Sequence, residues 1–126
     1  MFRKILLLAC LLSVFIAVSA QSSKSQTTLR MLKTATTLVE AQQFEAAEEY
    51  YKKGLTNARA DYDAYNQAVA YEGLGNLYTK TDQPEKAITN YTSAVRIYRL
   101  LKYNVLADVV ESLLKSVKGI GDLYAG

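Results

Sequence analysis

The sequence lacks histidine and tryptophan, and it contains one cysteine, Cys10, and one proline, Pro84. Beyond residue 20 the chain therefore has neither histidine nor cysteine. This part cannot form a disulfide bond, and it lacks the side chains that most often serve as general bases, nucleophiles and transition-metal ligands. We therefore expect no catalytic, cofactor-binding or metal-binding site, and we do not expect an enzyme.

Paired carboxylates are the remaining candidates for catalysis. Glu45, Glu48 and Glu49 lie at the start of a predicted helix and are followed by Lys52 and Lys53. Acids early in a helix and bases later match the helix dipole and allow ion pairs four residues apart. The pattern indicates a solvated helix face rather than the carboxylate pair of a hydrolase.

Basic and acidic residues nearly balance, with 15 Lys and Arg against 12 Asp and Glu. A nucleic-acid-binding protein is expected to gather its bases on one face, and no such cluster is present, so we expect no nucleic-acid partner. Arg96, Arg99 and Lys102 do follow one another at three-residue spacing. They are either an anion-binding patch or, more commonly for such a run, a solvated helix end favoured by the dipole.

Residues 1–20 have the order of a secretory signal peptide. Arg3 and Lys4 precede an apolar run over residues 5–18, and small residues lead to Ala20. This order of basic start, apolar middle and small-residue cleavage site predicts cleavage after Ala20. The mature chain would then begin at Gln21, carry no stable membrane span, and be exported to the periplasm or outside the cell.

Two alternatives to a cleaved signal are disfavoured. A transmembrane anchor needs about 20 apolar residues, whereas this run is shorter and contains Ser13. A lipid anchor at Cys10 would follow from the preceding Leu-Leu-Ala, but the apolar run continues for eight residues beyond the cysteine.

The rest of the chain is predicted to be all-α. Residues 21–26 are rich in Ser and Gln and are interpreted as a flexible lead-in. Thereafter no alternation of apolar and polar residues suggests a strand, and helix-forming residues dominate. Short connections between helices imply antiparallel neighbours. The five predicted helices cover about residues 27–41, 44–58, 62–80, 84–101 and 104–124.

Two sequence patterns repeat. A small–aromatic–small set that begins at Ala47 recurs from Ala87, with each set on one face of its helix. The pentapeptide LGNLY at 74–78 returns as IGDLY at 120–124, and we interpret each copy as the packing seam of a repeat's first helix. We expect Gly75 to be a close-packing position that tolerates alanine but not leucine. The two sets are Ala47, Tyr51 and Gly54, and Ala87, Tyr91 and Ala94.

These patterns resemble the tetratricopeptide repeat (TPR) family, in its longer-helix variant. That family carries a bulky residue, Leu-Gly and an aromatic on its first helix, then a small–aromatic–small set on its second. The resemblance covers residues 27–126, and it implies a short α-solenoid of about two and a half repeats. The usual proline after the second helix is absent, and the 40-residue period exceeds the usual 34. The second repeat meets the signature with Tyr71, Leu74, Gly75, Tyr78, Ala87, Tyr91 and Ala94.

The resemblance also implies a non-catalytic function in binding a protein or peptide, in a concave groove lined by each repeat's first helix. One subclass of the family clamps a carboxylate with Lys and Asn one turn apart. Asn76 is present here, but Glu72 takes the place of the lysine, so we reject this clamp. The residues expected to line the groove are Tyr65, Val69, Glu72, Asn76 and Lys80, together with Glu111, Lys115, Lys118 and Asp122.

Alternative interpretations remain open. Apolar residues cover about half of the last predicted helix, which is broader than a surface helix needs, so we expect it to be covered by another copy of the protein, by a partner chain or by further residues of a longer chain. The chain would then be a structural or oligomerisation arm, or the N-terminal fragment of a larger repeat assembly. A further alternative is an aromatic platform for sugar or peptide at Tyr62 and Tyr65.

Overall fold

The chain forms an all-α stack, as expected from the sequence. The computed structural model describes the backbone of residues 2–125 and the side chains of residues 3, 4, 9, 10 and 23–120. The described backbone contains five helices: α1 (Phe2–Glu40), α2 (Phe44–Ala60), α3 (Ala64–Lys80), α4 (Pro84–Leu100) and α5 (Asn104–Ala125).

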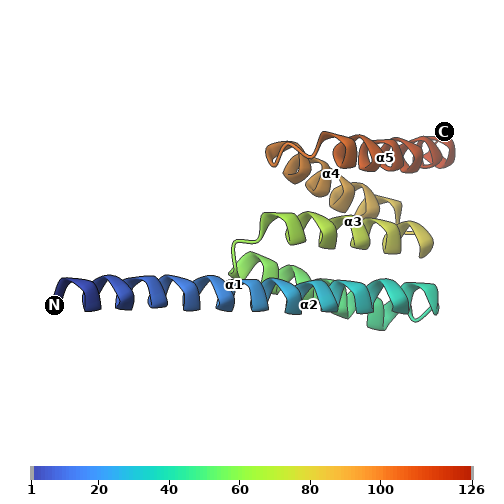
Figure 1. The fold of residues 1–126 in the computed structure, drawn as a ribbon. Helices are drawn as coiled ribbons and strands as arrows, with labels where there is room; N and C mark the ends of the chain where they lie inside the picture. The colour runs from blue at the N-terminus through green and yellow to red at the C-terminus, as the bar shows by residue number, and fades with distance from the viewer. Residues whose placement is uncertain (1, 126) are drawn as a thin grey trace.

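Consecutive helices are antiparallel and pack against each other along the whole stack (Figure 1). The helices α1, α3 and α5 follow one another up the stack, and α1 also contacts α3 directly. The first half of α1 extends beyond the other helices (Figure 1). This arrangement of helix pairs is that of an α-solenoid.

Helix α1 begins much earlier than the sequence predicts. Residues 21–26, interpreted above as a flexible lead-in, are helical and continuous with the rest of α1. Side-chain contacts with the α2–α3 turn hold this segment: the Ser25 hydroxyl donates to Asp63 Oδ2 over 3.1 Å, and Lys24 Nζ lies 4.0 Å from Asp61 Oδ1. These contacts join residues that are distant in the sequence, so a local reading of composition does not find them. The other predicted helix boundaries lie within two residues of those observed.

Four turns with the same backbone conformation connect the helices, and they are evenly spaced along the sequence. In each turn one non-glycine residue has a positive φ, which ends the helix and reverses the chain. In the α2–α3 turn, Tyr62 N–H donates to Arg59 C=O and Asp63 N–H to Ala58 C=O. A helix and its turn therefore form a 20-residue unit, and a helix pair spans 40. The positive φ angles are 60° at Gln42, 54° at Tyr62, 57° at Asp82 and 66° at Lys102.

The 40-residue spacing corrects the alignment of the last repeat. Leu114 of α5 takes the buried position of Leu74 in α3, whereas the pentapeptide comparison used a spacing of 46. Ile120, which begins the second pentapeptide, is 49% exposed, and the side chains of residues 121–124 lie outside those described. The second pentapeptide is therefore not the counterpart of the first. The buried residues that correspond at this spacing are Ala70, Leu74 and Leu77 in α3 and Val110, Leu114 and Val117 in α5.

Four buried tyrosines form the centre of the core. Each ring is at most 5% exposed, and each hydroxyl reaches a polar partner on another helix over 2.6–3.0 Å. Such pairing avoids the cost of burying a hydroxyl without a hydrogen bond. The pairs are Tyr51 with Thr36, Tyr78 with Glu48, Tyr91 with Asn76 and Tyr98 with Glu72.

The buried tyrosines make the fold sensitive to alkali. Burial raises the pKa of each of these four hydroxyls above its ordinary value, and the Glu72 carboxylate raises the pKa of Tyr98 further. Above about pH 10 the unfolded chain loses these protons while the folded chain keeps them, so the free energy of unfolding falls as pH rises. The limiting slope is about 1.4 kcal/mol per pH unit for each tyrosine.

Urea unfolding between pH 8 and 11, followed by circular dichroism, measures this slope. The variant Tyr98→Phe removes one of the four groups and is expected to reduce the slope. A free energy of unfolding that stays constant over this range would contradict the assignment.

Candidate functional site

The predicted groove residues of α3 lie along one accessible side of this helix. Tyr65 is 43% exposed, Asn76 and Lys80 are also exposed, and Val69 and Glu72 are half-buried. Their spacing of three or four residues places them on one helix face. The structure therefore brings the α3 half of the predicted groove together.

Tyrosines from α4 hold the two central polar groups of this side of α3. Tyr98 Oη donates to Glu72 Oε2 over 2.8 Å, and Tyr91 Oη donates to Asn76 Oδ1 over 2.6 Å. A carboxylate and an amide each have hydrogen-bonding capacity beyond one such bond. Glu72 and Asn76 are thus fixed in place and can still bind a ligand group.

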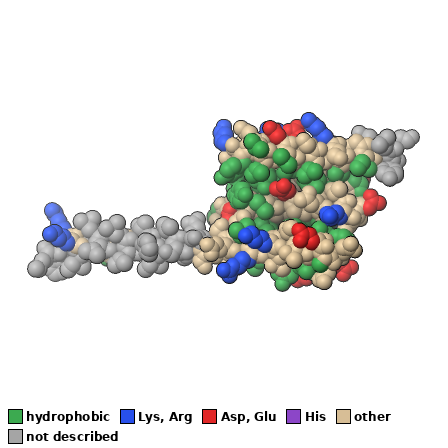
Figure 2. All heavy atoms as spheres, turned by 45° about the vertical axis from the view of Figure 1, so that its right-hand side comes forward, with side chains coloured by type: hydrophobic (Ala, Val, Ile, Leu, Met, Phe, Trp, Pro, Cys, Tyr) green, Lys and Arg blue, Asp and Glu red, His purple; other side chains and the backbone are tan. Residues whose placement is uncertain are grey.

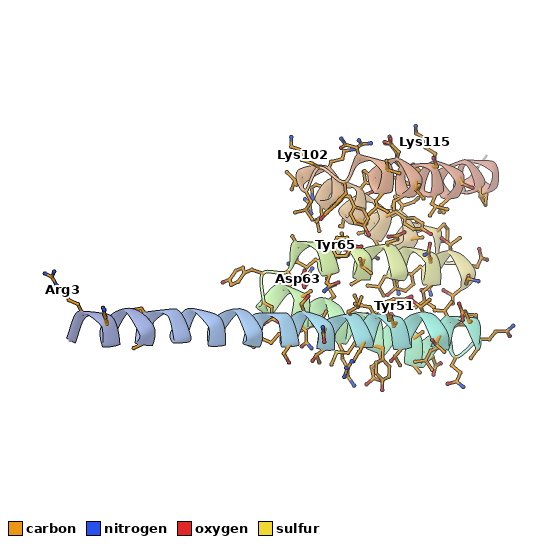
Figure 3. All side chains as sticks on the ribbon, in the orientation of Figure 1. Arg3, Tyr51, Asp63, Tyr65, Lys102 and Lys115 are labelled. Carbon is orange, nitrogen blue, oxygen red and sulfur yellow. The ribbon has the colours of Figure 1, made fainter. Side chains whose placement is uncertain are left out.

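Aromatic side chains gather at the turn end of the same surface. The Tyr65 ring packs edge-on against Tyr98 and Tyr103, with centroids 6.3 and 5.6 Å apart. Asp63 and Tyr65 lie close together where α3 begins (Figure 3). An open hollow of about 380 Å³ is present here, lined by Ser25, Asp61, Tyr62, Asp63, Ala64, Tyr65 and Leu101.

The predicted α5 residues do not join the α3 residues. Glu111 forms ion pairs with Arg99 of α4 and with Lys115, the latter at 3.7 Å. Lys115 lies on the side of α5 turned away from α3 (Figure 3). Lys118 is exposed, and the side chain of Asp122 lies outside those described.

The 40-residue spacing explains this separation. Arg99 donates a hydrogen bond to Glu111. Its counterpart in the preceding repeat, Arg59, donates in the same way to the Tyr71 hydroxyl. Glu111 is therefore the counterpart of Tyr71, which faces α2, and not of a residue on the groove side. The sequence prediction for α5 relied on the 46-residue spacing of the pentapeptides, and this shift of six residues selected a side of the helix about a third of a turn away from the groove side.

At a spacing of 40, the groove side of α5 is uncharged and combines valine and isoleucine with two serines. Val105, Val109 and Ile120 are 77%, 52% and 49% exposed, and the neighbouring Leu113 is 37% exposed. We call the surface formed by this side of α5 and the groove side of α3 the odd-helix face. Its α3 residues are Tyr65, Val69, Glu72, Asn76 and Lys80, and its α5 residues are Val105, Val109, Ser112, Ser116 and Ile120.

Exposed hydrophobic side chains are visible on one face of the stack (Figure 2). Figure 2 shows hydrophobic side chains gathered in bands across the stack, with isolated charged side chains among them. Exposed apolar groups of this kind are typical of surfaces that bind a partner. The predicted helix starts at 44, 84 and 104 differ by multiples of 20, and this is the sequence signal that identifies the α5 residues.

Other charged groups form the ion pairs four residues apart that the sequence predicts. Glu48 and Lys52 pair at 2.8 Å, and Glu49 and Lys53 at 2.9 Å, each four residues apart along α2. Arg99 lies 3.4 Å from Asp108 as well as pairing with Glu111, as suits a solvated helix end.

The described residues also limit other kinds of site. Among them, no three His, Cys, Asp or Glu side chains come together as metal ligands. No helix within the described part of the chain is both long enough and apolar enough to span a membrane.

Comparison with known proteins identifies one family. The tetratricopeptide repeat family model matches residues 27–99, which run from within α1 to the last turn of α4. This match includes both small–aromatic–small sets and the first pentapeptide. Neither the curated proteins nor the solved structures gave a match.

Proposed function

Because the chain belongs to the tetratricopeptide repeat family, we propose that it is a non-catalytic interaction module that binds a protein or peptide on its odd-helix face. Repeats of this family generally mediate protein–protein interactions. The observation that supports this site is the exposed apolar side of α5 beside the fixed polar groups of α3. Binding surfaces combine apolar anchors with polar groups in this way.

We further propose that the module acts after export, in the periplasm or outside the cell. The support is the signal-like order of residues 1–20. The intact mass of the chain isolated from its native host tests this part of the proposal. Loss of Met1 to Ala20 supports export, and a mass that retains them contradicts cleavage.

Recovery of partners by the immobilised chain tests the binding site. The variant Val105→Asn/Val109→Asn makes the α5 side of the odd-helix face polar without adding charge, and both positions are exposed. Proteins recovered from the exported fraction of the native host with the wild type are expected to be lost with this variant. The reason is that the apolar anchors of the interface are removed.

A matched control keeps the odd-helix face intact. Thr89→Asn/Thr92→Asn changes two exposed residues of α4, and it should recover the same proteins as the wild type. Equal recovery by both double variants, with unchanged circular dichroism, would rule out the odd-helix face as the site.

A second candidate function is an oligomerisation arm that associates through α5. The exposed Val105, Val109, Leu113 and Ile120 favour it, because they leave apolar surface uncovered. Light scattering of the purified chain over a range of concentrations tests this candidate. Mass that rises with concentration and is lowered by Val105→Asn/Val109→Asn supports the arm, and a constant monomer mass excludes it.

A further inference from the structure

Acidic residues outnumber basic ones from the α2–α3 turn through α3, which ends at Lys80. From Asp61 to Thr79 the sequence has three carboxylates, Asp61, Asp63 and Glu72, and no lysine or arginine. The chain as a whole has more basic than acidic residues. Of the α3 residues of the odd-helix face, Glu72 and Lys80 are charged, whereas Asp61 and Asp63 lie in the turn before α3.

Two of these three carboxylates already have partners. Asp63 accepts hydrogen bonds from Ser25 and from both the backbone and the side chain of Asn66, and these bonds fix the α2–α3 turn. Asp61 lies 4.0 Å from the Lys24 ammonium. Both have structural roles at the turn.

Glu72 differs from the other two. Its carboxylate accepts a hydrogen bond from the Tyr98 hydroxyl, but across residues 23–120 no lysine or arginine forms an ion pair with it. The only basic residue on its side of α3 is Lys80, which is eight residues away, or about 12 Å along the helix. Arg99, near the end of α4, is engaged by Asp108 and Glu111.

The surroundings of Glu72 strengthen its attraction for a cation. It is half-buried, and its counterpart in α5 at the 40-residue spacing is the uncharged Ser112. A charge that is partly shielded from water attracts an opposite charge more strongly than one in bulk solvent. The ring face of Tyr65, two turns earlier on the same side of α3, is a second favourable contact for a cation.

From this arrangement we infer that the partner segment is basic and apolar: a stretch of protein with Lys or Arg seated at Glu72 and apolar side chains on Val69, Val105 and Val109. This inference rests on the proposed function and specifies its ligand. An acidic segment would be repelled by Glu72. A second copy that docked through its own α5 side would bring apolar groups but no cation to this carboxylate.

A random peptide library displayed on phage, selected on the immobilised chain, tests the inference. Peptides selected by the wild type are expected to share a Lys or Arg flanked by apolar residues. With Glu72→Lys, that base should disappear from the selected peptides and Asp or Glu should replace it. The control Glu85→Lys, an exposed acid in the first turn of α4, should leave the wild-type preference unchanged.

A synthetic peptide with the selected sequence then gives affinities. Glu72→Gln is expected to weaken its binding roughly tenfold, as the loss of a charge-assisted bond does. Glu85→Gln should change the affinity little. The variant Glu72→Asp keeps the charge on a shorter side chain. Binding by Glu72→Asp that is closer to wild type than binding by Glu72→Gln shows that the charge matters, rather than the shape of the side chain.

The outcomes separate this inference from the proposed function. Peptides that lack a base, yet are lost with Val105→Asn/Val109→Asn, overturn the basic ligand and leave the odd-helix face as the site. Peptides that are insensitive to that double variant, or a library that yields no binder, overturn both.

Discussion

Replacing Tyr91 with alanine is expected to lower the free energy of unfolding by about 3–5 kcal/mol, the cost of emptying a large aromatic site in a core. The ring is 2% exposed and lies against Gly75, and the hydroxyl donates to Asn76. Such a loss is a large part of the stability of a small domain. Urea unfolding followed by circular dichroism measures it.

Two comparisons separate the ring of Tyr91 from its hydroxyl. Tyr91→Phe keeps the ring and leaves Asn76 without its donor, so we expect a loss of about 1 kcal/mol. Tyr50→Ala, at a position 37% exposed on α2, should cost much less than Tyr91→Ala. Equal losses for Tyr50→Ala and Tyr91→Ala would mean that Tyr91 is not the core residue described.

Replacing Gly75 with alanine is the second large change, and here the structure reverses the expectation from sequence. A Cβ at this position would lie 2.5 Å from Cδ1 and Cε1 of Tyr91. Because these atoms belong to the body of a buried ring, the helices must separate or the ring must move. We expect a loss of about 1–3 kcal/mol from this overpacking, although alanine alone favours a helix.

The control for this change is Gly119→Ala in α5. A Cβ there meets nothing within 4 Å, so its higher helix propensity should stabilise the fold by up to about 1 kcal/mol. Removing the ring should relieve the clash. The loss of stability in the double variant Gly75→Ala/Tyr91→Leu should therefore be smaller than the sum of the losses in the two single variants. A rise in stability with Gly75→Ala alone would contradict the close contact of α3 with Tyr91.

Much of the fold could be predicted because it depends on local patterns. Helix-forming residues separated by short turns predict the helices, and the small–aromatic–small sets predict how α2 and α4 pack. The length of α1 could not be predicted, since the contacts of Ser25 and Lys24 with the α2–α3 turn are distant in sequence. Whether position 75 tolerates alanine depends on where the Tyr91 ring lies, and a sequence pattern does not give that position.

The candidate site was predicted in part for the same reason. The α3 side follows directly from helical spacing, and the structure shows it on one surface. The α5 side did not follow, because a pentapeptide that recurs by chance at a different spacing hides the even spacing of the turns. The Tyr98 hydrogen bond that fixes Glu72 joins two helices through residues distant in the sequence, so only the structure reveals it.

Site-specific photo-crosslinking in the native host tests the central claim, that the odd-helix face binds the partner. A photoreactive residue is placed in turn at Ser112 and Ser116 on the odd-helix face of α5, and at Thr56 on α2 and Thr92 on α4, all exposed positions. We predict covalent adducts of one partner protein from Ser112 and Ser116 and none from Thr56 and Thr92. Adducts from Thr56 or Thr92, with none from Ser112 and Ser116, would contradict the claim.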